Sequence, residues 1–218
     1  MKKERVIKYK GQHLDIYFHV DRCNHFAACL SGAPEVFNLM RKPWIRPDAA
    51  AADKIIRVIE KCPTGALHYR RHDDGQEEMT PTENSGQITR HGPIYLRGNL
   101  EVLDENGEKI IEDTRLGLCR CGKSRHKPHC DGEHLYQGYL EAGKFPEGTP
   151  ERQPELLPKG KLSITLSPSG PFKLSGPVTL KDAEGKIRFQ GEKTALCSCG
   201  LTKNPPLCDG SHKALEVP

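Results

Sequence analysis

Residues Cys119–His134 read CRCGKSRHKPHCDGEH and decide how the rest of the chain is interpreted. Cys119, Cys121 and Cys130 supply three thiols within this stretch, and His134 adds an imidazole. Thiols and imidazole at such short spacing are the donor set of a metal site rather than of a hydrophobic core. The stretch therefore predicts a metal centre held in a single loop.

The same pattern occurs a second time at Cys197–His212, which reads CSCGLTKNPPLCDGSH. Cys197, Cys199, Cys208 and His212 have the spacing of the first four donors. A shift of 78 residues superposes 88–134 on 166–212 without a gap, with 15 identities in 47 positions. We therefore predict a structural repeat with one metal site in each copy.

The composition favours several small units over one large core. The 218 residues are only 35% hydrophobic and 6% aromatic, and they include 21 glycines and 17 prolines. Small units with little core need a disulfide or a metal to stabilise them. The basic residues are scattered and are not interleaved with aromatic ones, so the composition does not indicate a nucleic-acid-binding protein.

The nine cysteines fall into three groups of three, each with a histidine nearby. An odd number, the short C-x-C spacing and a charged start, MKKERV, without an apolar run argue against a secreted disulfide framework. We therefore expect three metal sites and a reducing, cytoplasmic setting. No apolar run approaches the length of a membrane span, so we expect no membrane association.

The third group lies near the N-terminus, where Cys23 and Cys29 flank a loop and Cys62 opens the sequence CPTGA. Between them, residues 48–61 are rich in alanine with isoleucines on one side, which predicts a helix with Asp48 at its N-cap. With strands expected at 14–18 and after Cys62, this stretch resembles the divergent single-cluster ferredoxins.

The chain departs from ordinary single-cluster ferredoxins, because Phe26 stands where that family has a further cysteine. Three cysteine ligands imply either a [3Fe-4S] cluster or a [4Fe-4S] cluster completed by another residue. His25 is our candidate for that residue, and a surface histidine is an equally weighted alternative.

Both repeated loops satisfy the pattern C-x-C-x2-[S/T]-x3-P-x-C-D-G-x-H. The donor set alone fits structural zinc as well as iron–sulfur clusters. The fuller pattern resembles the CDGSH iron–sulfur domain family, also called NEET proteins. The resemblance implies a [2Fe-2S] cluster in each copy, with Cys119 and Cys121 on one iron and Cys130 and His134 on the other. Cys197 and Cys199 pair likewise against Cys208 and His212.

Four further residues of the pattern are expected to support the clusters. Asp131 and Asp209 are placed to cap the short helix that presents each histidine. Ser124 and Thr202 are expected to donate hydroxyl hydrogen bonds toward the cluster.

A histidine ligand raises the potential of a cluster. Metal and proton compete for the imidazole, so we expect faster cluster loss below about pH 6.5.

These observations predict an α+β protein: a small ferredoxin-like domain followed by two small antiparallel-β CDGSH units related by a pseudo-two-fold axis. The expected boundaries are a domain at 1–72, a linker at 73–87, the first unit at 88–140, a Pro/Gly-rich connector at 141–165 and the second unit at 166–218. Single-motif members of the family form intertwined homodimers, so the tandem motif implies a monomer with an internal pseudo-dimer.

We expect the protein to transfer electrons to or from a redox protein partner. The alternatives are storage or transfer of clusters to an apo-acceptor, redox or pH sensing, and a zinc-stabilised interaction module. No nucleophile-and-base arrangement, phosphate loop or dinucleotide fingerprint occurs, so we do not expect an enzyme.

Overall fold

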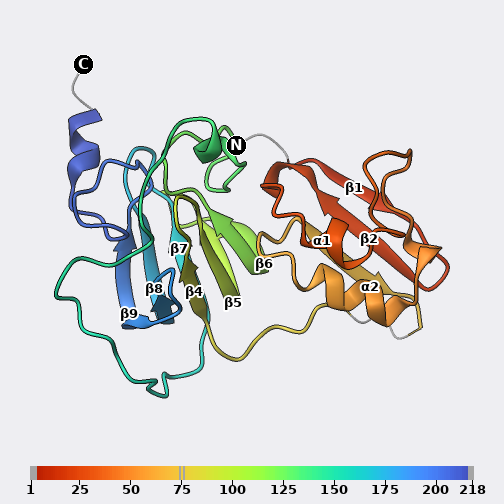
Figure 1. Ribbon diagram of the computed structural model, residues 1–218. Coiled ribbons are helices and arrows are strands. Elements are labelled where there is room, and N and C mark those ends of the chain that lie inside the picture. Colours follow the sequence, from red (N-terminus) through yellow and green to blue (C-terminus); the bar gives the residue numbers. More distant parts are fainter. Residues whose placement is uncertain (1–3, 74, 76, 216–218) are drawn as a thin grey trace. The chain divides into compact units, whose positions relative to one another are not determined.

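The computed structural model describes residues 4–73, 75 and 77–215, and residues 74 and 76 of the predicted linker lie outside that set. The chain divides into two compact units, Met1–Met79 and Thr80–Pro218 (Figure 1). Within the described residues, no helix combines the length and the apolar character that crossing a membrane requires.

Unit 1 is a three-stranded antiparallel sheet packed against short helices. Strand β2 is central, and its partners are β1 on one side and β3 on the other. The elements are β1 (Val6–Tyr9), β2 (Leu14–His19), η1 (Val20–Arg22), α1 (Ala28–Gly32), η2 (Pro47–Ala49), α2 (Ala52–Ile59) and β3 (Leu67–Arg71).

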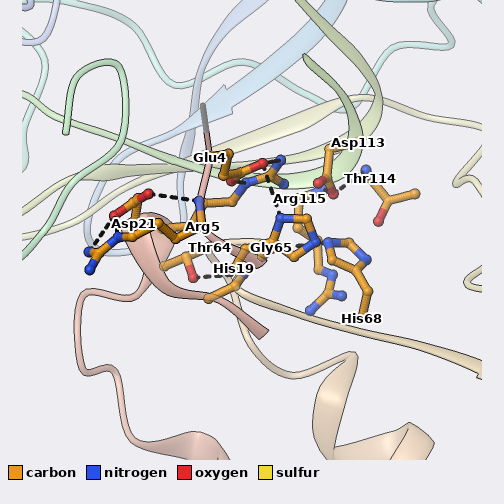
Figure 2. Close-up of polar contacts among 12 residues, drawn as sticks. Glu4, Arg5, His19, Asp21, Thr64, Gly65, His68, Asp113, Thr114 and Arg115 are labelled. Carbon is orange, nitrogen blue, oxygen red and sulfur yellow. Dashed lines mark hydrogen bonds and ion pairs between the residues drawn. The ribbon is translucent and has the colours of Figure 1, made fainter. Parts of the chain in front are cut away.

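Apolar side chains of the sheet and of α2 form the core of unit 1. Leu14 and Ile16 of β2 pack with Ile55 and Ile59 of α2, and all four are almost completely buried. At the start of β1, Arg5 donates to Asp21 at 2.9 Å and Glu4 lies 3.1 Å from His19 (Figure 2). These contacts tie the first strand to the turn that follows β2.

Helix α2 is shorter than the sequence predicted. It begins at Ala52 and ends at Ile59, whereas a helix over 48–61 was expected. Asp48 does not cap it, because the Asp48 carboxylate accepts a hydrogen bond from the backbone N–H of Gln12 at 2.7 Å. Pro47 instead opens a separate 3-10 turn. The Asp48 side chain, which the local sequence predicted to cap the helix, is therefore used in a long-range contact instead.

Unit 2 contains a six-stranded sheet and both copies of the repeat. Each copy has a short strand, then two ten-residue strands joined by a hairpin, then the metal loop and a short 3-10 helix. The elements are β4 (Ser85–Ile88), β5 (Ile94–Leu103), β6 (Lys109–Leu118), η3 (Glu133–Leu135), β7 (Leu162–Thr165), β8 (Phe172–Lys181), β9 (Ile187–Leu196) and η4 (Ser211–Leu215).

The two copies share one sheet, whereas the residues of each copy predicted a small antiparallel sheet of its own; strands paired between copies are what the resemblance to intertwined homodimers implied. Strand β4 pairs antiparallel with β5 of its own copy and parallel with β8 of the other. Strand β7 does the reverse, pairing antiparallel with β8 and parallel with β5. The buried residues of both copies accordingly form a single hydrophobic core. Neither copy could bury its apolar face alone.

Strand β4 begins inside the stretch expected to be a linker, and β7 lies wholly inside the stretch expected to be a connector. Strand β4 starts at Ser85, within 73–87, and β7 occupies Leu162–Thr165, at the end of 141–165. The sequence Ser-Gly-Gln has turn chemistry, but Gly86 is needed for packing. A Cβ on Gly86 would lie 2.6 Å from Leu180 and 2.9 Å from Leu96. The rest of the connector passes beside β9, to which Arg152 donates a backbone bond (Figure 1).

The sequence predicts hairpin turns at Asp104–Gly107 and Asp182–Gly185, and the structure has a turn at both places. Asp104 and Gly107 close the turn between β5 and β6, and Asp182 and Gly185 close the turn between β8 and β9. The aspartate carboxylate of each turn accepts two backbone N–H bonds at 2.9 to 3.0 Å. This bonding explains why both copies have an aspartate at this position of the turn.

Candidate metal centres

The donor atoms of each metal loop come together in pairs. The sulfur atoms of Cys119 and Cys121 are 3.6 Å apart, and Cys130 Sγ lies 3.3 Å from His134 Nδ1. In the second copy, the corresponding distances are 3.5 Å between the sulfurs of Cys197 and Cys199 and 3.4 Å from Cys208 Sγ to His212 Nδ1. Two sulfurs that each lie about 2.3 Å from one tetrahedral metal are about 3.8 Å apart. Each pair therefore has the spacing of two ligands on one metal ion.

Each loop thus presents two donor pairs. Two metal ions per loop, each held by one pair, fit this spacing. A mononuclear zinc site would use the same three thiols and imidazole, so the donor set alone fits zinc as well.

Main-chain bonds fix each loop to the end of its strand. The N–H of Cys119 donates to Pro128 O at 2.9 Å, and the N–H of Cys130 donates to Gly117 O at 2.8 Å. In the second copy, Cys197 donates to Pro206 O and Cys208 to Ala195 O, both at 2.9 Å. The third cysteine is thereby brought back beside the first, which explains how one short loop supplies both pairs.

The aspartates Asp131 and Asp209 link the two ends of each loop. One carboxylate oxygen of Asp131 accepts from the N–H of Glu133 at 3.1 Å, and the other accepts from Arg125 at 2.9 Å. Asp209 makes the same contacts with Ser211 at 2.9 Å and Lys203 at 2.7 Å. Asp131 is not the expected helix cap, because the N-cap of η3 is Gly132, which makes no side-chain cap hydrogen bond, and Asp131 closes the turn one residue earlier. The second contact was not anticipated.

The hydroxyl groups of Ser124 and Thr202 do not donate toward the cluster position as expected. Ser124 Oγ donates to His129 O at 2.6 Å, and Thr202 Oγ1 donates to Leu207 O at 2.7 Å. Because a hydroxyl carries one hydrogen, these bonds leave none for a sulfur atom. Both residues brace the loop. The backbone N–H groups of Ser124 and Gly122 instead donate to the sulfur of Cys119.

The environment of the first loop shifts the pKa values of its donors in different directions. A hydrogen bond from Cys121 and the amides of Ser124 and Gly122 lower the pKa of Cys119, and the same bond between the two thiols raises the pKa of Cys121. A thiolate is the form that binds metal. Burial, together with the positive charge of Arg120, lowers the pKa of His134. The shifts at Cys119 and His134 favour the protonation states of metal ligands, whereas the shift at Cys121 does not.

Unit 1 brings Cys23, Cys29 and Cys62 to one hollow, which the apolar side chains of Phe18 and Trp44 also line. Burial raises the pKa of Cys29 to about 11, and the neighbouring thiols of Cys62 and Cys23 add to the shift. Thiolates in such a place need a cation close by, and a metal centre supplies it. Thr64 Oγ1 lies 3.4 Å from the sulfur of Cys62.

His25 is placed differently from the other candidates. Its side chain is exposed, it does not line the hollow, and its backbone has a φ of 62°. Its backbone N–H, however, donates to the sulfur of Cys23. Asn24, which the sequence reasoning did not consider, is buried and lines the hollow.

Comparison with known proteins agrees with these sites. The family described as "Divergent 4Fe-4S mono-cluster" matches residues 9–72. The family described as "Iron-binding zinc finger CDGSH type" matches twice, over residues 91–135 and 169–213. The chain belongs to the CDGSH family. It is an iron–sulfur protein with two CDGSH copies after a 4Fe-4S-type domain, as the sequence predicted.

Part of this CDGSH protein also has curated relatives. It is similar to the "Uncharacterized protein YjdI" of Escherichia coli strain K12 and to the protein of the same name from Escherichia coli O157:H7. Each is 45% identical over 62 residues, which is 28% of this chain and 82% of the relative. No solved structure matches the chain.

Contacts between the two CDGSH loops were not foreseen from the sequence. A Cβ on Gly122 would lie 2.3 Å from Cys199 O, and a Cβ on Gly200 would lie 2.7 Å from Cys121 O. Both glycines have positive φ, 76° and 79°. The glycine after each C-x-C lets the two CDGSH loops meet backbone to backbone, so the two metal centres are neighbours.

Proposed function

We propose that this CDGSH protein is an electron carrier with two [2Fe-2S] clusters and one ferredoxin-like cluster. The observation that carries the proposal is the twofold occurrence of one thiol–thiol pair and one thiol–imidazole pair at the spacing of ligands on one metal. A bound cluster supplies one-electron redox chemistry at iron. The role of the chain is to hold, orient and tune it.

In the first copy, Cys119 and Cys121 would hold one iron, and Cys130 and His134 the other. In the second copy, Cys197 and Cys199 would pair against Cys208 and His212. The amide donors to Cys119 and the burial of Cys119, Cys121 and Cys197 would tune the potential, because hydrogen bonds to sulfur and restricted solvent both do so. The contact between Gly122 and Cys199 supports electron exchange between these two centres.

For unit 1 we propose a [3Fe-4S] or [4Fe-4S] cluster on Cys23, Cys29 and Cys62. A role of the His25 imidazole as the fourth ligand remains a prediction, and it requires this exposed side chain to turn toward the hollow. Thr64, within hydrogen-bond distance of Cys62, would tune this cluster.

The reciprocal strand pairing supports a pseudo-two-fold axis between the copies and therefore a monomer with an internal pseudo-dimer. All nine cysteines are described and are present as thiols rather than disulfides, which supports a cytoplasmic location. We propose a redox protein as partner and a carrier rather than an enzyme. We propose no binding to nucleic acid or to a membrane.

The alternative is storage and delivery of clusters, or sensing of pH or redox state. It is favoured by the partial exposure of His134 and His212, which contrasts with the burial of Cys119 and Cys197. A partly exposed imidazole is the ligand most open to protons and to an acceptor protein.

Reduction and reoxidation of the purified holoprotein separates the two functions. An electron carrier is expected to pass through repeated cycles with its visible absorption and its iron content unchanged. A delivery protein is expected to lose iron and sulfide to an added apo-ferredoxin in the same period. Transfer to apo-ferredoxin on the timescale of reduction would overturn electron transfer as the main function.

A further inference from the structure

The residue between the first two ligand cysteines differs between the copies: it is Arg120 in the first and Ser198 in the second. Both side chains anchor the loop in the same way. Arg120 Nε donates to Gly92 O at 2.8 Å, and Ser198 Oγ donates to Gly170 O at 2.6 Å. Anchoring therefore needs only a neutral donor, and the positive charge of Arg120 is an addition found in one copy.

This charge is buried beside the first centre. The side chain of Arg120 is only 2% exposed and forms an ion pair with Glu141, whose side chain is 13% exposed. A second guanidinium nitrogen donates to Thr89 O, and the ring of Tyr139 lies 5.8 Å from the guanidinium carbon. Water is thus largely excluded, so the charge acts at low dielectric.

The guanidinium lies next to the histidine ligand. The carbonyl of Gly92 accepts the hydrogen bond from Arg120 Nε. A Cβ added to the same Gly92 would lie 3.6 Å from His134 Nε2. In the second copy, the equivalent Gly170 lies similarly against His212, at 3.8 Å, but Ser198 brings no charge. The two centres thus share their ligand geometry and differ in one buried charged pair.

A fixed positive charge near a cluster stabilises the reduced form, which carries one electron more. A fixed negative charge does the opposite. Arg120 reaches the loop itself, whereas Glu141 contacts the site through Arg120. The net effect at the first centre is therefore set by the closer, positive member of the pair.

We propose that Arg120 and Glu141 give the two CDGSH centres different reduction potentials, with the first centre reduced first. Arg120 raises the potential of the first centre, and Glu141 limits the increase. Both are positioning and tuning residues rather than ligands. The inference rests on the proposed [2Fe-2S] clusters and adds to them an order of reduction.

The test is a redox titration of the holoprotein followed by electron paramagnetic resonance. Two one-electron steps are expected in the unmodified protein. The step that moves in His134→Cys belongs to the first copy, and the step that moves in His212→Cys belongs to the second. At a fixed potential, Arg120→Gln is expected to lower the reduced-to-oxidised ratio of the first centre at least tenfold, which is about 59 mV. Glu141→Gln is expected to raise this ratio.

Two further variants control for structural damage. Ser198→Ala removes the same anchor from the second copy without changing a charge, so it is expected to leave both potentials in place. Arg120→Lys keeps the charge, so it is expected to keep the two steps separate. If the substitutions acted only through lost packing, the reduction potential of the first centre would shift in the same direction in Arg120→Gln and in Glu141→Gln.

Opposite shifts in Arg120→Gln and Glu141→Gln support the inference. Shifts of the same sign, no shift with both clusters retained, or a single shared potential in the unmodified protein would overturn it. Failure of the proposed function is recognised separately and earlier, because protein without iron and sulfide shows no step to titrate.

Discussion

Gly122 of the first CDGSH loop lies directly against the carbonyl of Cys199 in the second, so close that an added Cβ would be 2.3 Å from that oxygen. Gly200 and Cys121 make the reciprocal contact at 2.7 Å. The two metal loops therefore support each other, and damage to one is expected to reach the other.

The first prediction concerns this contact. Gly122→Ala is expected to destabilise the protein by more than Gly107→Ala. Both positions have positive φ, 76° and 86°, which costs a non-glycine residue about 1 to 2 kcal/mol, but nothing lies within 4 Å of a Cβ on Gly107. Thermal unfolding followed by circular dichroism measures the difference. Gly122→Ala is also expected to speed loss of the cluster in the second copy, and equal melting temperatures for the two variants would contradict the contact.

The second prediction uses the two hairpin turns as a matched pair. Asp182→Asn is expected to cost about 1 to 3 kcal/mol, and Asp104→Asn about 0.5 to 1.5 kcal/mol. The difference arises because Asp182 is 1% exposed and also accepts from Arg188 Nε at 2.7 Å. Urea unfolding at neutral pH measures both costs.

The pH dependence of the Asp182 effect follows from its pKa. Burial alone would raise this pKa, but hydrogen bonds from Arg188, Lys186 and Glu184 hold it below the ordinary value of 3.8. The stabilisation by Asp182 is therefore complete above about pH 3.8 and is lost as the pH falls through the folded-state pKa. The difference in the free energy of unfolding between wild type and Asp182→Asn should become smaller below pH 3.8. A difference that becomes larger there would contradict the role of the Asp182 carboxylate.

The third prediction tests the role of the two loop hydroxyls. Ser124→Ala and Thr202→Val are expected to speed cluster loss several-fold, because each removes a partly buried bond to a loop carbonyl worth about 1 kcal/mol. The reduction potentials should stay in place, since neither hydroxyl donates to sulfur. Redox titration of the retained clusters measures this. A shifted potential would support the expectation from the sequence that these hydroxyls donate hydrogen bonds toward the cluster.

The fourth prediction concerns the cluster of unit 1. Cys23→Ser is expected to remove this cluster and to leave the CDGSH spectrum unchanged. His25→Ala is expected to retain its iron, because the backbone N–H that donates to Cys23 survives the substitution. Iron analysis of both variants measures this, and loss of iron from His25→Ala would show that the imidazole is a ligand.

The sequence predicted the features that depend on local spacing. The repeated C-x-C and C-D-G-x-H patterns predicted which donors come together, and Asp104 with Gly107 predicted a turn. It failed where a distant contact decided the outcome. Asp48 binds Gln12 instead of capping a helix, and Gly86 belongs to a strand because that segment pairs with β5 and with β8 of the other copy.

The exchange of strands between copies follows from the resemblance to intertwined homodimers and not from the residues of either copy. Apolar alternation marks a strand as buried on one face but does not say which neighbour it pairs with. The partner of Arg120 was missed for a similar reason, because Glu141 lies 21 residues away along a connector with no pattern of its own.

The most direct test of the account is the count of iron and acid-labile sulfide per chain in protein purified without oxygen, together with its visible absorption. Three clusters predict about seven or eight irons, a similar number of sulfides and a red-brown colour. Colourless protein with about one zinc ion per CDGSH copy and no sulfide would contradict it.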